Sequence, residues 1–212
     1  MLSVVRRPKR EMALTSPQPE MEPAAHKSLA LSALVQQMQS DRKYEILDLG
    51  PALGVNIGFW SQFQSRLYVA DFYRSLGSSD SLQLQEGIPY ESVFRALLTG
   101  AADARFDIIL AWDIFNYLNH DLLEGFIHYL GKLCRPGTFL FALISIMQQI
   151  PSDPIIFRIL DREQLLYENR SAQVRPCPRH QAREINRMMA GFRVFGSFIL
   201  RHGVQEYLFV RE

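Results

Sequence analysis

The strongest structural signal in the chain is a near-continuous apolar run at residues 106–112, which reads Phe-Asp-Ile-Ile-Leu-Ala-Trp. Strands buried on both faces of a parallel sheet have this composition, whereas strands with one solvated face alternate apolar and polar residues. A helical stretch over about 120–133 and a second apolar run at 138–144 follow it. Because strand, helix and strand in succession form a right-handed crossover, this pattern predicts a parallel α/β sheet.

A second strand–loop–helix unit precedes this run. Residues 44–50 form a short apolar run that ends in glycine, and a helix is predicted from about 56 to 64. The next predicted strand, 66–70, ends on Asp71. In doubly wound sheets, ligands lie at the carboxyl ends of the strands, near the point where the strand order reverses. The loop after residue 48 is therefore the predicted ligand site.

Length and composition limit the remaining organisation. A chain of 212 residues, 48% of them hydrophobic, accommodates one full α/β domain. We expect a mobile arm over residues 1–25 and a domain over 26–212, with a basic insertion at about 148–187 that contains a helix over 155–167. Helices are also predicted over 27–38, 90–99 and 181–190, and a closing hairpin from 193–200 and 205–210.

Charge and cysteine content exclude several classes of protein. The formal net charge is +1, so nucleic acid is not favoured as a partner. No apolar run approaches the roughly 20 residues that span a bilayer, so no membrane is expected. Two cysteines are too few for a disulfide framework, and we expect a cytoplasmic protein. Cys177 and His180 offer two possible metal ligands, whereas a structural zinc site needs four, so no metal is expected.

Small residues recur in the predicted ligand loop, at Gly50, Ala52 and Gly54, and residues 50–54 are called the glycine loop below. Small side chains let a backbone approach a bulky ligand closely. With Asp48, this segment resembles the first motif of class I S-adenosylmethionine-dependent methyltransferases, which reads acid-x-Gly-x-Gly-x-Gly. Ala52 replaces the central glycine of that motif.

Later features resemble the same family in the same order. Asp71 ends the second strand, 106–113 resembles the fourth motif, Arg135-Pro136-Gly137 resembles the turn before the fifth strand, and Gly191-Phe192 precedes a closing hairpin. The resemblance implies an α/β fold, a three-layer αβα Rossmann-like sandwich. Its mostly parallel sheet would have the order 3-2-1-4-5-7-6 with a C-terminal antiparallel hairpin.

The resemblance also implies S-adenosylmethionine as cofactor. Asp71 would accept hydrogen bonds from the ribose hydroxyls, and Phe72 would either stack near the adenine or pack in the core. The third motif has no clear counterpart, and Glu86 is a weak stand-in for the adenine-binding acid. The cofactor-binding residues expected from the resemblance are Asp48, Gly50, Ala52, Gly54, Asn56, Asp71, Phe72 and Asp113.

A methyltransferase of this kind would act on a small-molecule or protein acceptor. By position, Asn116, Tyr117 and His120 are candidate substrate residues, although Asn116 could simply cap the next helix and His120 could lie on its surface. No catalytic base is assigned. The arginine-rich segment 158–187 and the N-terminal arm are candidate contacts for a protein partner, although a solvated basic face is the simpler explanation of the arginines.

Two other functions fit the same pattern. The first is a methyltransferase-like protein that has lost catalysis and serves as a binding or scaffold subunit, which the altered glycine loop and the missing third motif permit. The second is a nicotinamide-dependent oxidoreductase. It fits less well, because the first, third and sixth positions of its glycine fingerprint hold Gly50, Ala52 and Val55.

Overall fold

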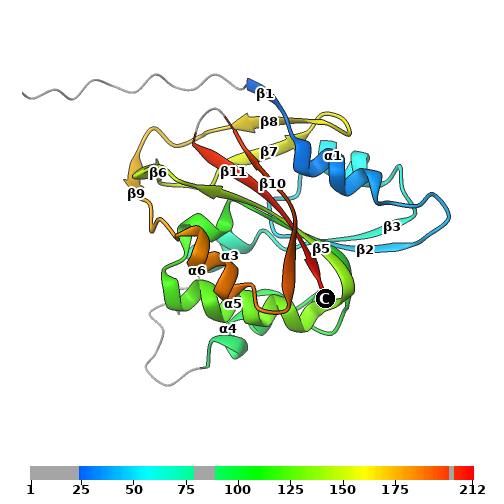
Figure 1. Cartoon of the computed structure of the whole chain (residues 1–212), viewed down its shortest axis with the longest axis horizontal. Coiled ribbons are helices and arrows are strands. Elements are labelled where there is room, and N and C mark those ends of the chain that lie inside the picture. The colour runs from blue at the N-terminus through cyan, green and yellow to red at the C-terminus, as the bar shows by residue number, and fades with distance from the viewer. Residues whose placement is uncertain (1–23, 79–88, 201–202) are drawn as a thin grey trace, which may run out of the picture.

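A six-stranded sheet forms the centre of the computed structural model, which describes residues 24–78, 89–200 and 203–212 (Figure 1). Its strand order is β10-β11-β5-β4-β2-β3, with β2, β3, β4 and β5 parallel and β11 and β10 antiparallel. The strands are β2 (Tyr44–Asp48), β3 (Ser65–Val69), β4 (Phe106–Trp112), β5 (Cys134–Ser145), β10 (Phe192–Ile199) and β11 (Val204–Arg211).

This arrangement confirms the predicted α/β fold and its C-terminal hairpin. The described strands give the predicted order from the second strand onward, 2-1-4-5-7-6. A third strand would fall between Asp71 and Phe106, where residues 79–88, including Glu86, lie outside the described part of the chain. Most of the predicted arm, residues 1–23, lies outside it as well.

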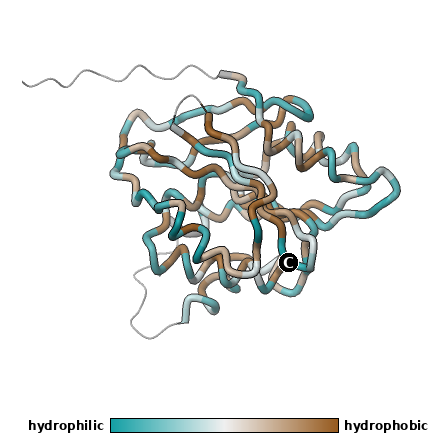
Figure 2. The backbone as a smooth tube through the Cα atoms, in the orientation of Figure 1, coloured by the Kyte–Doolittle hydropathy of each residue, from teal (hydrophilic) through white to brown (hydrophobic). Residues whose placement is uncertain are grey.

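Helices cover both faces of the sheet. One face carries α3 (Phe72–Ser78), α4 (Tyr90–Leu97), α5 (His120–Leu133) and α6 (Ala182–Met188), and the other carries α1 (Leu29–Gln36) and α2 (Gly54–Trp60). A 3-10 turn, η2 (Ile114–Tyr117), follows β4. Apolar segments concentrate on the central strands between these two layers (Figure 2).

The central strand β4 supplies both hydrophobic cores. All seven of its residues are buried, and successive side chains point to opposite faces of the sheet. Ile109 and Ala111 pack with α4 and α5, whereas Ile108, Leu110 and Trp112 pack with α1 and α2. Trp112 therefore lies on the α2 side, at the carboxyl end of the sheet.

The predicted helix over 155–167 is wrong. Instead β7 (Ile156–Ile159) and β8 (Gln164–Glu168) form an antiparallel hairpin, in which Phe157 pairs with Tyr167. Burial alternates along both strands, so side chains such as Phe157 and Ile159 reach the core while their neighbours stay more exposed. The buried apolar residues of this segment follow a two-residue period, which is the period of a strand and not of a helix.

Two further strand pairs involve the predicted insertion. β1 (Ala24–Lys27) adds to β8 and includes the last two residues of the predicted arm. β6 (Gln149–Pro151) pairs with β9 (Val174–Pro176). Within the described residues, no helix is both long and apolar enough to cross a membrane.

Candidate cofactor site

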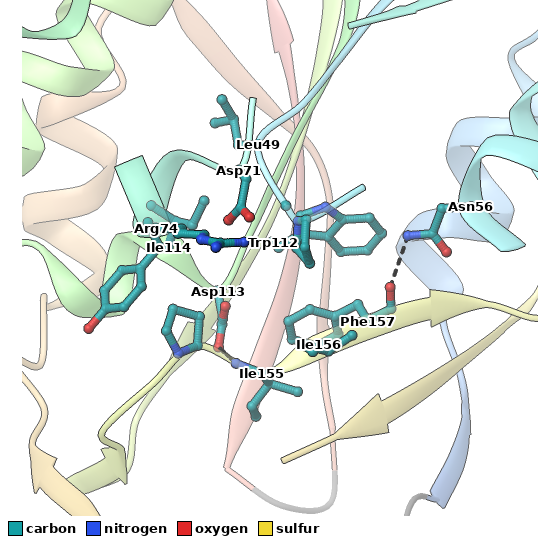
Figure 3. Close-up of a pocket in the computed structure, with 14 residues that line it drawn as sticks. Leu49, Asn56, Asp71, Arg74, Trp112, Asp113, Ile114, Ile155, Ile156 and Phe157 are labelled. Atoms are coloured by element: carbon teal, nitrogen blue, oxygen red, sulfur yellow. Dashed lines mark hydrogen bonds between the residues drawn. The ribbon is translucent and has the colours of Figure 1, made fainter. Parts of the chain in front are cut away.

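A cavity lies where β2, β3 and β4 end, at the point where the strand order reverses (Figure 3). Parallel α/β sheets bind their ligands at this position. Its volume is about 180 Å³. The walls come from the three strand ends, the start of α2 and α3, the segment before β7 and the first two residues of β7: Leu49, Gly50, Pro51, Asn56, Asp71, Tyr73, Arg74, Trp112, Asp113, Ile114, Pro154, Ile155, Ile156 and Phe157.

Asp48 holds the glycine loop and the end of β4 together. Its Oδ1 accepts hydrogen bonds from the backbone N–H of Gly50 at 2.9 Å and from the Trp112 indole Nε1–H at 2.6 Å. The side chain is buried, and this burial raises the pKa of the Asp48 carboxyl to about 6 against the two hydrogen bonds, which lower it. Asp48 thus binds the protein's own groups and does not line the cavity.

Trp112 lies directly on the glycine loop. A Cβ atom added at Gly50 would come within 3.0 Å of the indole Cδ1 and Nε1 atoms, so glycine permits this close approach. The other side of the indole stacks on Phe157 of β7, with ring centroids 5.3 Å apart and planes 4° from parallel. The backbone of Trp112 has a φ of +50°, a left-handed conformation that is rare for a bulky residue.

Asp71, the acid that the family resemblance implies for ribose binding, follows β3 and faces the cavity (Figure 3). Its φ of +38° is left-handed, and its backbone N–H donates to the Gly50 carbonyl at 3.1 Å. The two residues that follow this turn, Phe72 and Tyr73, lie in different environments. Phe72 is fully buried and stacks on Phe126, with centroids 4.2 Å apart, so it packs in the core as the second of its two expected roles. Tyr73 lines the cavity.

Asn56 lines the cavity, but both ends of its amide bind β7. Its Nδ2 donates to the Phe157 carbonyl at 2.9 Å, and its Oδ1 accepts from the Ile159 N–H at 2.8 Å. This pair of bonds fastens the hairpin over the start of α2. Ala52 and Gly54, also expected at the cofactor, are exposed and do not contribute to the cavity wall.

Asp113 follows Trp112 and also faces the cavity, although it is only 5% exposed. Its Oδ2 accepts a hydrogen bond from the Ile155 N–H at 3.0 Å. Burial raises the pKa of the Asp113 carboxyl to about 7, and the hydrogen bond from the Ile155 N–H opposes that rise.

The three expected substrate residues do not line this cavity. Asn116 is buried and bridges to β5, with its Nδ2 donating to the Leu143 carbonyl and its Oδ1 accepting from the Ser145 N–H. The Tyr117 hydroxyl donates to the Asp153 carbonyl at 3.0 Å. His120 lies at the start of α5, half-exposed, beside Asp121 and Arg187.

Sequence reasoning missed the covering segment, residues 154–157, together with Tyr73, Arg74 and the role of Trp112. The sequence predicts that Trp112 is a buried strand residue. It does not predict that the indole packs on Gly50, in the loop that follows β2. The covering segment comes about 40 residues later in the chain, and the incorrect helix placed its side chains in the wrong pattern.

Four arginines of the basic segment have partners within the protein. Arg158 and Arg170 bind Glu168, whereas Arg162 and Arg175 lie over the rings of Phe63 and Tyr117. Among the residues that the structure describes, no group of three or more His, Cys, Asp or Glu side chains could hold a metal ion.

Comparisons with known proteins support the fold. No protein-family model matches the chain, and no curated protein matches it in sequence. Among solved structures, the PH0226 protein from Pyrococcus horikoshii OT3 aligns with a TM-score of 0.51 and 9% identity, over 86% of this chain and 89% of that one. An S-adenosylmethionine-dependent methyltransferase from Clostridium acetobutylicum ATCC 824 gives a TM-score of 0.50 and 12% identity, over 86% and 91%. The chain therefore has the fold of a class I methyltransferase.

S-adenosylmethionine, the cofactor that this fold implies, fits the described cleft only in part. Asp71 presents a carboxylate to the cavity, as the resemblance implies for a ribose-binding acid, and Gly50 forms part of the wall. Trp112, however, covers the loop, and about 180 Å³ is less than the roughly 300–1,000 Å³ of typical small-molecule pockets. The whole cofactor fits only if the indole leaves Gly50.

Proposed function

We propose that this chain is an S-adenosylmethionine-dependent methyltransferase, with its cofactor site in the cleft at the ends of β2, β3 and β4. One observation carries the proposal. Gly50, Asp71 and Asp113, from three separate strand ends, converge on one cavity at the switch point of a methyltransferase fold. Asp71 would bind the ribose hydroxyls, and the Gly50 backbone would support the remainder of the cofactor.

A second candidate function rests on the position of Trp112. Its indole is fixed on three sides, by Asp48, Gly50 and Phe157, and it occupies space above the glycine loop. If that arrangement never opens, the chain is a methyltransferase-fold protein without a cofactor, and it serves as a binding or scaffold subunit. The two candidates differ in whether an adenosyl ligand binds.

Calorimetric titration with S-adenosylmethionine, S-adenosylhomocysteine and NAD separates these functions. A methyltransferase binds both adenosyl ligands and not NAD. Asp71→Asn should weaken adenosyl binding by roughly 10- to 100-fold, because a hydrogen bond to a charged group contributes about 1.5–3 kcal/mol. Asp103→Asn is the matched control, since Asp103 is 87% exposed in its side chain and pairs with Arg95 away from the cleft.

The absence of binding by either adenosyl ligand to folded protein would reject the methyltransferase and favour the scaffold. Binding of NAD alone would instead support the oxidoreductase. Equal adenosyl affinities for the wild type and Asp71→Asn would show that the ribose assignment is wrong even if the ligand binds.

A further inference from the structure

The β7–β8 hairpin, which covers the cleft, is paired along its other edge with β1. Residues Ala24–Lys27 pair with Gln164–Tyr167, so β1, β8 and β7 form a three-stranded sheet beside the central one. The Ser28 N–H then donates to the Glu163 carbonyl at 2.7 Å, and Lys27 forms an ion pair with Glu163. The described chain therefore begins on the outer edge of the segment that closes the cleft (Figure 1).

Four rings follow one another from β1 to the glycine loop. The centroid of the His26 ring lies 4.7 Å from that of Tyr167 in β8, and Tyr167 meets Phe157 of β7 edge-on at 4.9 Å. Phe157 stacks on Trp112 at 5.3 Å, and the indole packs on Gly50. Because closely packed side chains transmit strain, a shift at one end of this ring series reaches the other.

Tyr167, the ring of the series that lies next to β1, is positioned by packing. Its hydroxyl is buried and has no hydrogen-bond partner among the described residues. On β1, Ala25 and Lys27 are exposed and His26 is half-buried, so His26 connects this strand to the ring series. Removal of β1 uncovers one side of the Tyr167 ring and lets it shift.

Trp112 is the member of the series with two alternative positions. Its backbone φ of +50° is strained, and such strain persists only where the surrounding structure holds it. The indole is seated on Gly50, and the whole cofactor fits only if it leaves that seat. An element with two positions is what coupling between distant sites requires. The ring series therefore joins β1 to the opening of the cleft.

The helix that follows β1 is anchored separately. The Ser28 hydroxyl accepts a hydrogen bond from the Leu31 N–H at 3.1 Å, and the buried Glu206 carboxylate accepts from the Ala30 N–H at 3.0 Å. These bonds hold the start of α1 on the central sheet through β11. Consequently β1 can leave β8 while α1 stays in place.

We propose that β1 is a strap that controls the cofactor cleft. While residues 24–27 are paired with β8, the ring series keeps Trp112 on Gly50; when they leave, the hairpin loosens and the indole is released. The inference rests on the proposed function, because the site that the strap regulates is the proposed cofactor site. Coupling is reciprocal, so a ligand in the cleft weakens the pairing of β1, and a partner that draws the N-terminal segment away favours ligand binding.

The first test follows the ligand-free full chain by NMR and hydrogen exchange. His26→Pro removes a ring and a backbone N–H from β1, whereas the control Lys27→Ala, on the same strand, removes only an exposed ion pair. In His26→Pro, exchange at the Ile159 N–H of β7 should become faster by about tenfold or more, while β4 and β5 stay protected. The indole signal of Trp112, assigned with Trp60→Phe, should shift.

The second test measures the affinity for S-adenosylhomocysteine by calorimetry. His26→Pro should bind it more tightly than the wild type by about threefold or more, since part of the cost of opening the cleft has been removed. In a Trp112→Gly background, where no indole has to move, His26→Pro should add nothing. This non-additivity distinguishes the ring series from a general loss of stability.

Unchanged Ile159 exchange and an unshifted Trp112 signal in His26→Pro would overturn the inference. If the proline variant does not fold, His26→Ala, which removes the ring alone, decides the matter by the same two signals. Equal effects in Lys27→Ala would also overturn it, because that change leaves the ring series intact.

The ligand-free signals keep this inference separate from the proposed function. If both signals respond and no adenosyl ligand binds, the coupling of β1 to the cleft stands and the proposed function fails. If S-adenosylhomocysteine binds equally to the wild type and His26→Pro and neither signal responds, the proposed function stands and the strap fails.

Discussion

At the residue scale, Trp112 governs the shape of the cleft. It combines a left-handed backbone, a hydrogen bond to a buried acid and a stack on a ring from a distant hairpin. A non-glycine residue in this region of φ costs on the order of 1–3 kcal/mol and persists only where its surroundings hold it. Such strain at a ligand cavity points to a functional constraint on this side chain.

Trp112→Gly tests this constraint. Glycine adopts positive φ without strain, and loss of the indole exposes the glycine loop. We expect S-adenosylhomocysteine to bind more tightly, because the protein no longer has to displace a side chain before binding. The fold should lose about 2–4 kcal/mol, since truncation of a buried tryptophan costs roughly 3–5 kcal/mol and the relieved strain offsets part of it.

Calorimetry and urea unfolding measure the two effects separately. Trp60→Phe is the control, because Trp60, the last residue of α2, is fully buried in the core and does not line the cavity. It should change adenosyl affinity little. Weaker binding in Trp112→Gly would mean that the indole supports the ligand instead of excluding it.

Asp107 is a second residue with a defined structural role, at the opposite end of β4. Its buried carboxylate accepts from the Glu45 N–H at 2.9 Å and from Arg42 at 2.6 Å, with Arg135 at 3.3 Å. Asp107→Ala leaves a backbone donor without its partner and should lower the free energy of unfolding by about 1–3 kcal/mol. Denaturant titration checks this, and Asp103→Ala, at an exposed ion pair, should cost less than about 1 kcal/mol.

At the scale of elements, the β7–β8 hairpin closes the cleft. Asn56 fastens β7 to α2, Asp113 fastens Ile155, and Phe157 covers Trp112. Segments that cover a binding site are natural places for ligand-dependent motion. Opening of this hairpin is the expected route by which a ligand larger than the cavity enters.

Asn56→Ala should loosen the hairpin specifically. The Ile159 N–H loses its acceptor, so its hydrogen exchange should become faster, while amides of β4 and β5 keep their protection. Ser61→Ala is the matched control on the same helix, because the Ser61 hydroxyl bonds only the exposed Gly58 carbonyl among the described residues. Unchanged exchange at Ile159 would show that the Asn56 bonds do not hold β7.

The elements and the position of the cavity were largely predictable, whereas the contacts that cover the cavity were not. Strand β4 and helix α5 have the predicted bounds. A continuous apolar run marks β4, and the helical spacing of apolar residues with the Asn119 cap marks α5. The ends of β2 and β3 also follow from the pattern, which places Gly50 and Asp71 at one site. By contrast, the contacts of Asp48 with Trp112 and of Asn56 with β7 join residues 64 or more positions apart. No local pattern encodes contacts of that kind.

At the scale of the whole molecule, the sheet has a hydrophobic core on each face. Two buried acids, Asp48 and Asp113, lie at the end of the sheet next to the cleft. The pKa values of Asp48 and Asp113 rise to about 6 and about 7, from an ordinary value of 3.8, chiefly through burial. Between pH 4 and 7 the native state therefore binds more protons at these sites than the unfolded chain does. Their contribution to stability is largest below pH 4 and is lost as the pH rises toward 7.

Asp113→Asn should remove part of this pH dependence. The difference in unfolding free energy between the variant and the wild type should shift in favour of the variant as the pH rises from 5 to 8. Urea unfolding at several pH values measures that difference, and comparison of the two proteins cancels other titrating groups. Two parallel stability profiles would contradict the raised pKa of Asp113.

The most direct test of the proposed function is a titration of the Trp60→Phe protein with S-adenosylhomocysteine, followed by the fluorescence of Trp112. This variant leaves Trp112 as the single tryptophan, seated on the loop where the ligand should bind. Saturable change in Trp112 emission, with an affinity that matches calorimetry and weakens in Asp71→Asn, is the predicted result. A folded protein whose Trp112 emission and heat of mixing do not respond to S-adenosylhomocysteine would contradict it.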